Sequence, residues 1–301
     1  MQRIQIDTDP GTDDALALMM AFNSPEVRVE GITTVGGNAS LARTTRNALR
    51  LLEYIGVHNV PVARGAARPL NGRFSYGYDV HGGTGLTVRM PVPKSLPMAA
   101  RAPEFIAHLG YALRGEMVIV ALGPLTNVAL ALKGEPSLVK WVKQIIVMGG
   151  AFNCPGNTTP HAEFNVFNDP EATDLVLNSG VPVRMVGIDV CRQVYITGLE
   201  NVWYFGESRS AHLANKILSG YFATHPSRSR FHLYDPLAMA AAIQPDLFTF
   251  KNAIIRVETA DSEYRGRTTA TLDQESVVHL AVGVDAPRAS KLISERLAAG
   301  P

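Results

Sequence analysis

The alternation of short apolar runs with helix-like segments is the feature that most restricts the fold of this 301-residue chain. Runs typical of buried strands occur at residues 4–6, 27–35, 117–122, 144–148 and 181–188. Segments with helical spacing fall between and after them, at residues 15–22, 43–55, 125–133 and 170–179. Parallel strands need a crossover, usually a helix, so this order predicts a doubly wound, Rossmann-like α/β fold with a largely parallel central sheet and helices on both faces.

The whole chain, residues 1–301, is predicted to form a single α/β domain. Residues 61–103 contain six prolines and six glycines that interrupt any regular pattern. Because the α/β pattern resumes directly afterwards, we interpret this segment as a long excursion rather than a linker between domains. Later elements are expected as strands at residues 252–258, 268–272 and 277–282, followed by a helix at residues 287–297.

Charge and composition exclude several classes of partner. The 28 lysines and arginines nearly balance 27 acidic residues, which leaves no electrostatic footprint for nucleic acid or an anionic membrane. The longest apolar run, residues 15–22, falls far below the roughly 18 residues of a membrane span. Two cysteines and an N-terminus interrupted by aspartates argue against a disulfide scaffold and a secretory signal. We therefore expect a cytoplasmic protein with neither nucleic acid nor membrane as partner.

The strongest chemical signal is a group of four carboxylates in residues 7–14. Asp7 and Asp9 end the first predicted strand, and Asp13 and Asp14 begin the next helix, where unpaired N–H groups can stabilise one or two of them. Two carboxylates about 4 Å apart repel by roughly 4 kcal/mol at an effective dielectric constant near 20. Converging carboxylates must therefore take up protons or bind a cation, and all-oxygen ligation indicates calcium or magnesium rather than zinc. Simple helix and turn capping is the alternative.

Glycines and polar side chains also follow the other predicted strands, at residues 36–38, 123–127 and 149–150 and at Asp189. Ligands bind beyond the carboxyl ends of the strands in an open α/β sheet, although ordinary turns favour the same residue types. The polar segment 156–170 is more specific. Glu163 and Asn165, two residues apart, can point the same way and hold a polyhydroxylated ligand.

These motifs together resemble the inosine-uridine-preferring nucleoside hydrolases. The matching blocks run in family order, at residues 7–14, 36–38, 80–86, 123–127, 148–150, 163–165 and 235–236. The resemblance implies calcium-dependent hydrolysis of the N-glycosidic bond of ribonucleosides to a free base and ribose. It also implies one Ca²⁺ per subunit and a homo-oligomer, either a dimer or a tetramer. It leaves open whether purine or pyrimidine nucleosides are preferred.

The resemblance also assigns roles to individual positions. The implied calcium ligands are Asp9, Asp14, Asp235 and the main-chain carbonyl of Leu122. Asp9 would also be the general base for the attacking water, with Asn38 beside it. The implied substrate-binding residues are Asp13, Met148, Asn157, Glu163, Phe164 and Asn165. Carboxylates and amides suit this chemistry, because the sugar becomes oxocarbenium-like and gains positive charge as the base departs.

One position departs from the purine-preferring pattern. Many such members carry a histidine directly before the late metal-ligating aspartate, and this chain carries Tyr234 there. The acid that assists the departing base therefore stays open, with Tyr234 and His81 as catalytic candidates and His225 and His232 as further possibilities. Tyr221, Phe231 and Tyr234 could stack on a nucleobase.

Two other functions are compatible with parts of the pattern. A haloacid-dehalogenase-like phosphatase also has an aspartate-rich turn after its first strand, but its mechanism has no use for Asp235 or the segment around Glu163. A non-catalytic nucleoside-binding protein could share the scaffold, although the intact acidic positions argue against lost activity. Release of phosphate, of ribose, or of neither would distinguish the three.

Overall fold

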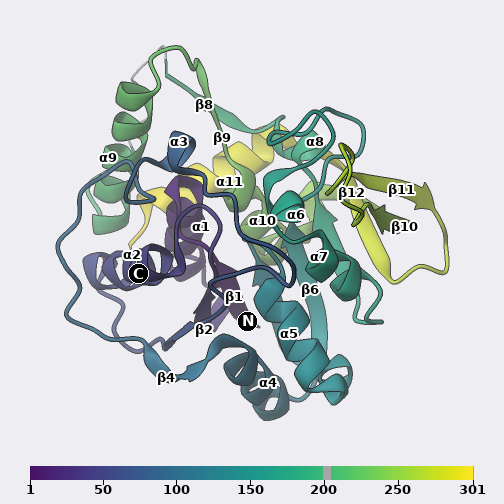
Figure 1. Cartoon of the computed structure of the whole chain (residues 1–301). Coiled ribbons are helices and arrows are strands. Elements are labelled where there is room, and N and C mark those ends of the chain that lie inside the picture. Colours follow the sequence, from purple (N-terminus) through teal and green to yellow (C-terminus); the bar gives the residue numbers. More distant parts are fainter. Residues whose placement is uncertain (199–204, 301) are drawn as a thin grey trace.

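The computed structural model describes residues 1–198 and 205–300, and it contains a large central sheet flanked by helices (Figure 1). Within these residues ten strands form the sheet, in the order β11-β10-β12-β7-β6-β5-β1-β2-β3-β4. Their bounds are β1 Gln2–Thr8, β2 Val27–Thr34, β3 Val62–Arg64, β4 Met98–Arg101, β5 Met117–Ala121, β6 Val142–Met148, β7 Val183–Val186, β10 Phe248–Val257, β11 Thr268–Leu272 and β12 Val278–Val284. A separate antiparallel pair joins β8 Tyr195–Thr197 and β9 Arg230–His232.

The sheet is parallel from β4 to β12, and β10 and β11 extend it antiparallel at one edge. The predicted doubly wound, largely parallel sheet is therefore confirmed. The chain builds outward from β1 to β2, β3 and β4, and it then returns to place β5 on the other side of β1. The carboxyl end of β1 is thus the topological switch point, where open α/β sheets bind ligands.

Helices cover both faces of the sheet, as predicted. Their bounds are α1 Thr12–Phe22, α2 Leu41–Ile55, α3 Tyr78–His81, α4 Ala102–Leu113, α5 Thr126–Gly134, α6 Phe164–Asn168, α7 Pro170–Leu177, α8 Ile188–Cys191, α9 Arg209–Thr224, α10 Tyr234–Ile243 and α11 Ala286–Ala298, with 3₁₀ turns at Pro136–Lys140 and Pro245–Leu247. One hydrophobic cluster packs α1, α2, α9, α10 and α11 against the sheet, and a second packs α4, α5 and α7 against the other face.

The first helix, α1, begins directly after the turn at residues 9–11 that follows β1. Gly11 is the N-cap, and the Asp14 side chain accepts a hydrogen bond from the Gly11 N–H at 2.9 Å. The following alanines, leucines and methionines favour a helix and are buried on all sides. This local sequence fixes Asp13 and Asp14 in the first turn, directly beyond β1.

The structure corrects the interpretation of residues 61–103 in part. Much of the segment is irregular, but it contributes β3 and β4 to one edge of the sheet and forms the one-turn helix α3. The two strands are only three and four residues long, too short for a periodic sequence signal. The strand predicted at residues 181–188 is likewise shorter, because Gly187 ends it and caps α8.

None of the helices in the described part of the chain is both long enough and apolar enough to span a membrane.

Candidate active site

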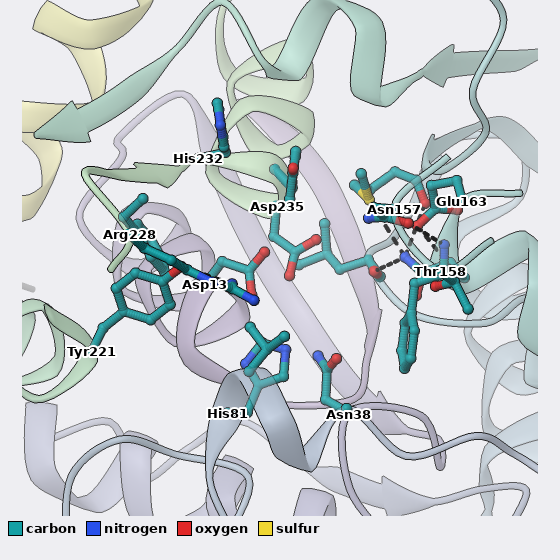
Figure 2. A pocket seen from close by; sticks show the side chains of 18 residues that line it. Asp13, Asn38, His81, Asn157, Thr158, Glu163, Tyr221, Arg228, His232 and Asp235 are labelled. Atoms are coloured by element: carbon teal, nitrogen blue, oxygen red, sulfur yellow. Dashed lines mark hydrogen bonds between the residues drawn. The ribbon is translucent and has the colours of Figure 1, made fainter. Parts of the chain in front are cut away.

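A cavity of about 240 Å³ opens beyond the carboxyl ends of the central strands (Figure 2). Asp13 and Asp235 lie at its centre, with Asn38 and His81 on one side and Asn157, Thr158 and Glu163 on another. The lining residues are Asp13, Asn38, Gly77, Val80, His81, Leu122, Met148, Asn157, Thr158, Glu163, Phe164, Asn165, Tyr221, Arg228, Phe231, His232, Tyr234 and Asp235. The cavity therefore collects side chains from segments far apart in the sequence at the switch point of the sheet.

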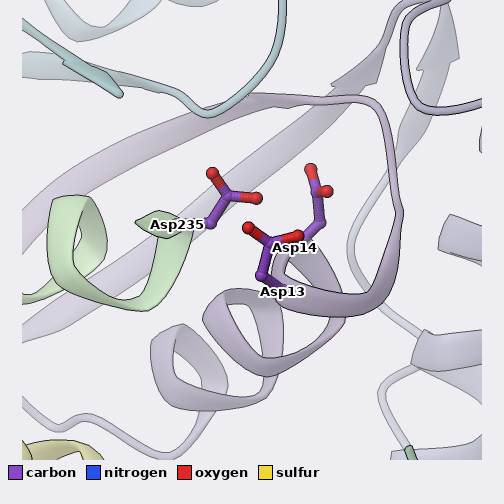
Figure 3. A group of neighbouring side chains, drawn as sticks. All are labelled: Asp13, Asp14 and Asp235. Atoms are coloured by element: carbon purple, nitrogen blue, oxygen red, sulfur yellow. The ribbon is translucent and has the colours of Figure 1, made fainter. Parts of the chain in front are cut away.

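Three carboxylates converge at the cavity floor (Figure 3). One oxygen each from Asp13, Asp14 and Asp235 can be chosen so that all lie within 4.8 Å of one another. Burial, followed by the charge of Asp14, raises the pKa of Asp13 to about 7. Burial and the charges of Asp13, Asp14 and Asp9 raise the pKa of Asp235 well above its usual range. Such a cluster fits a hard cation, which would relieve the repulsion among these groups.

Asp9 lies in a narrow space between two glycines. A Cβ atom at Gly37 or Gly123 would collide with the Asp9 carboxylate, so the close approach requires glycine at both positions. Oδ2 accepts a hydrogen bond from the Asn38 N–H at 2.6 Å. Oδ1 is buried and has no hydrogen-bond partner among the described residues. An unpaired buried carboxylate oxygen is costly, and a cation or a water would satisfy it.

Asp14 is held in place by hydrogen bonds from several directions. Its Oδ1 accepts from the Asp9 N–H at 3.2 Å, and its Oδ2 accepts from Asn38 Nδ2 at 2.8 Å. Asn38 therefore binds Asp9 through its backbone and Asp14 through its side chain. This network locks the two carboxylates in one relative position.

Glu163 forms the opposite wall as the N-cap of α6. Its carboxylate accepts hydrogen bonds from the N–H groups of Asn165 at 2.9 Å, Gly150 at 3.1 Å and Val166 at 3.1 Å. Burial nevertheless raises the pKa of Glu163. Asn165 donates through Nδ2 to the carbonyl oxygen of Leu122 at 2.7 Å, which connects this wall to the end of β5.

Aromatic and basic residues border the remaining side. Arg228 Nη1 donates to the Tyr221 hydroxyl at 3.0 Å, and both residues point toward the cavity from the α9–β9 segment (Figure 2). Among the described residues that line the cavity, Arg228 is the only arginine or lysine. Phe231 from β9 completes this wall. The segment thus presents one permanent cation and two aromatic rings.

Neither residue proposed as leaving-group acid is strongly acidic in this setting. His81 Nδ1 accepts a hydrogen bond from the Thr12 N–H at 3.0 Å, so the proton of the neutral ring resides on Nε2. Burial lowers the pKa of His81 to about 4 and raises the pKa of Tyr234 to about 12. His81 is thus a neutral hydrogen-bond donor at pH 7, and Tyr234 keeps its proton firmly.

The structure gathers nearly all the residues singled out from the sequence. The lining includes every substrate-binding candidate, both catalytic acid candidates, Asn38, Leu122 and Asp235. Asp9 and Asp14 do not line the cavity, but both are hydrogen-bonded to Asn38, which does. Asp189 and His225 are not among the lining residues; Asp189 instead accepts a weak hydrogen bond from the Phe152 N–H at 3.4 Å. Sequence reasoning did not single out Arg228 and Thr158 individually, although Thr158 lies in the polar segment 156–170 and Arg228 lies between the base-stacking candidates Tyr221 and Phe231.

Comparisons with known proteins identify the family of this chain. The family model described as inosine-uridine preferring nucleoside hydrolase matches residues 4–291. Uridine nucleosidase 1 of Arabidopsis thaliana is 41% identical over 265 residues, covering 86% of this chain and 79% of the relative. The pyrimidine-specific ribonucleoside hydrolase RihA of Salmonella typhi is 38% identical, covering 88% of this chain and 87% of the relative.

Among solved structures, a plant nucleoside hydrolase superposes with a TM-score of 0.93 at 36% identity, covering 99% of both chains. The fold and the comparisons together define an enzyme that hydrolyses the N-glycosyl bonds of ribonucleosides. The chain belongs to the inosine-uridine preferring nucleoside hydrolase family.

Proposed function

We propose that this enzyme hydrolyses pyrimidine ribonucleosides, uridine foremost, to the free base and ribose with a calcium ion on the acidic cluster. The observation that carries the proposal is the buried group of Asp13, Asp14 and Asp235 at the floor of a nucleoside-sized cavity. The names of the uridine- and pyrimidine-specific relatives support the choice of base. The resemblance further supports a homo-oligomer, and one sheet with strands from both ends of the chain supports a single domain.

The proposed calcium ligands are Asp9, Asp14, Asp235 and the carbonyl oxygen of Leu122. Two observations support a fit: Asp9 Oδ1 lacks a partner among the described residues, and the Leu122 carbonyl keeps a second lone pair beside its bond to Asn165. All four ligands are oxygens, as calcium prefers. Bound calcium would orient the ribose hydroxyls and lower the pKa of the attacking water. Asp13, which the cluster geometry places beside Asp14 and Asp235, is proposed to face the ribose.

The remaining polar wall is proposed to hold the sugar. Asp13, Glu163, Asn157 and Asn165 would bind ribose hydroxyls, with Met148 and Phe164 packing near the ring. As the C1′–N bond lengthens, the sugar gains positive charge, and the nearby carboxylates stabilise it more in the transition state than in the ground state. Their hydrogen-bonded positions require little reorganisation when this charge develops.

Asp9 is proposed as the general base. The oxygen of a water attacks C1′, the electron pair of the C1′–N bond leaves with the base, and Asp9 accepts the water proton. In the metal-free site, burial and the charge of Asp14 raise the pKa of Asp9 well above its usual range. The charge of a bound cation would lower this pKa again, so that Asp9 is ionised and able to accept the proton. Oδ2 keeps a second lone pair beside its hydrogen bond from Asn38, and this oxygen would accept the proton while Oδ1 faces the cation.

Arg228 is proposed to stabilise the departing base. A uracil that leaves with the bonding electrons carries negative charge on its carbonyl oxygens, and a guanidinium can bind this charge without transferring a proton. Because the pKa of Tyr234 is raised and His81 is neutral, stabilising the departing base as an anion is more effective than protonating it from either residue. His81 Nε2–H would contribute a neutral hydrogen bond.

The test measures release of ribose and free base from uridine, cytidine, inosine and adenosine in calcium, with phosphate release from ribose 5-phosphate as the assay for a phosphatase. We expect uridine to be cleaved with the highest kcat/KM. Arg228→Ala should lower that value by about 100-fold, since a hydrogen bond to a charged group contributes roughly 1.5–3 kcal/mol. The same variant should hydrolyse p-nitrophenyl riboside nearly normally, because that leaving group is already a stable anion.

Arg230→Ala is the matched control, because Arg230 is also exposed, lies two residues further on and packs over Tyr195 instead. Equal losses on uridine and on the nitrophenyl substrate would contradict the role of Arg228. Uncleaved nucleosides after prolonged incubation would favour a binding protein over an enzyme.

A further inference from the structure

Two separate segments border the side of the cavity where the nucleobase is proposed to bind, called the base side below. The one-turn helix α3 carries His81, and the segment from the end of α9 to β9 carries Tyr221 and Arg228. Beside the active site, these segments are separated by a second surface cavity of about 400 Å³, which Tyr78, Asp79, Gly82, Gly83, Thr224 and His225 help to line. Their relative position therefore depends on a few individual contacts.

His225, directly after α9, makes such a contact. Its Nε2 lies 2.8 Å from the carbonyl oxygen of Asp79 in α3, and its Nδ1 lies 2.9 Å from the carbonyl oxygen of Tyr221. The ring also stacks on Tyr221, with centroids 4.6 Å apart and planes 25° apart. Because a carbonyl oxygen can only accept, a ring with its proton on Nε2 donates to Asp79, and its Nδ1 then accepts from the Thr224 hydroxyl 3.0 Å away. A doubly protonated ring would donate to both carbonyl oxygens, so the hydrogen bond to Asp79 is present in either case.

The accepting carbonyl lies where a short helix has unsatisfied groups. Helix α3 has only four residues, and its last carbonyls have no following turn to donate to them. The other anchors of α3 lie toward α1 and α2, since Tyr78 Oη accepts from the Ser40 N–H at 3.2 Å and His81 Nδ1 accepts from Thr12. The hydrogen bond from His225 thus ties α3 to α9 on the side that faces the base.

We propose that His225 is a positioning residue that holds α3 against α9, so that His81 and the Tyr221–Arg228 pair face one another across the nucleobase. The inference rests on the proposed nucleosidase function, but the contact itself exists without substrate. Without the hydrogen bond from His225 to Asp79, a smaller fraction of the molecules has His81 and the Tyr221–Arg228 pair in position to bind the nucleobase. The apparent affinity for nucleoside falls by that fraction, whereas the substrate, once bound in the assembled state, reacts at the normal rate.

The test compares His225→Phe, which keeps the ring stack but removes the donor, with His225→Gln, whose amide nitrogen can replace Nε2–H. We expect His225→Phe to raise the KM for uridine about 5-fold, the loss of one hydrogen bond, and to change kcat by less than 2-fold. His225→Gln should restore the wild-type KM. Ser227→Ala, an exposed change in the same segment, is the control and should alter neither parameter.

Amide hydrogen exchange of residues 78–89 in the nucleoside-free protein gives a readout independent of turnover. Exchange should be about 5-fold faster in His225→Phe and normal in His225→Gln, with melting temperatures within about 2 °C of wild type. Equal behaviour of the two variants, or a fall in kcat at constant KM, would overturn the positioning role. If uridine were not cleaved but the exchange pattern held, the proposed function would fail and the positioning role of His225 would stand.

Discussion

Asp235→Asn is expected to lose bound calcium and turnover together. Asparagine keeps the shape and one oxygen ligand but removes a negative charge from a buried site. A unit charge at about 4 Å contributes roughly 4 kcal/mol at an effective dielectric constant near 20, which corresponds to nearly a thousandfold in affinity. The calcium affinity measured by calorimetric titration and the rate of uridine hydrolysis at limiting calcium should therefore fall in parallel, each by about a thousandfold.

The same substitution should have the opposite effect on the metal-free protein. Raised native-state pKa values mean that Asp13 and Asp235 favour protonation in the fold, so stability is full near pH 4 and is lost as pH rises through their native pKa values, about 7 for Asp13. In EDTA at pH 8, Asp235→Asn should melt at a higher temperature than wild type, and added calcium should reverse this order.

Asp246→Asn serves as the matched control, because Asp246 lies on the surface and pairs with Arg288. That variant should keep wild-type calcium affinity and turnover. If Asp235→Asn retained full calcium affinity and normal turnover, the assignment of Asp235 as a ligand would be wrong.

Removing the ribose 2′-hydroxyl should cause the second largest loss. When a site binds a substrate hydroxyl through buried polar groups, a substrate without that hydroxyl leaves those groups unpaired. Such sites typically discriminate against the substrate that lacks the hydroxyl by about 10⁴-fold. We expect kcat/KM for 2′-deoxyuridine to be at least about 100-fold below that for uridine, with much of the loss in kcat. Steady-state kinetics of the two substrates at saturating calcium provides the comparison.

Glu163→Gln supplies the corresponding change on the protein. If Glu163 stabilises the sugar by binding the ribose hydroxyls, Glu163→Gln should reduce the ratio of kcat/KM for uridine to kcat/KM for 2′-deoxyuridine. Removing the hydroxyl and replacing the carboxylate then disrupt the same interaction, so their effects are not additive. Equal kcat/KM for uridine and 2′-deoxyuridine in the wild type would contradict recognition of the ribose by this wall.

The acidic turn could be predicted from sequence because its geometry is local. Strand β1 and the capping turn of α1 are adjacent in the chain, so Asp9, Asp13 and Asp14 are confined to one end of the sheet before tertiary packing is known. The alternation of elements also predicts which strand ends meet there. Asn38 follows β2 closely and could therefore be placed at this end of the sheet, whereas Glu163 lies well beyond the end of β6 and was assigned to the site through the family resemblance.

The side of the cavity proposed for the nucleobase was predictable only in part: His81, Tyr221, Phe231 and Tyr234 were candidates and line the cavity, whereas Arg228 was not singled out. Arg228 reaches the cavity because the chain turns after α9 and returns along the three-residue strand β9, and neither step has a periodic sequence signal. The pairing of His225 with Asp79 joins residues 146 positions apart in the sequence. Such contacts depend on the packing of irregular segments, which local propensity does not encode.

The most direct test of the central claim is the incubation of calcium-loaded protein with uridine in ¹⁸O-labelled water, followed by mass spectrometry of both products. Hydrolysis at C1′ predicts equal amounts of uracil and ribose, with one ¹⁸O atom on the anomeric carbon of newly released ribose, in short reactions corrected for exchange in a parallel ribose control. Intact uridine after prolonged incubation, or label in ribose no higher than in that control, would contradict the account.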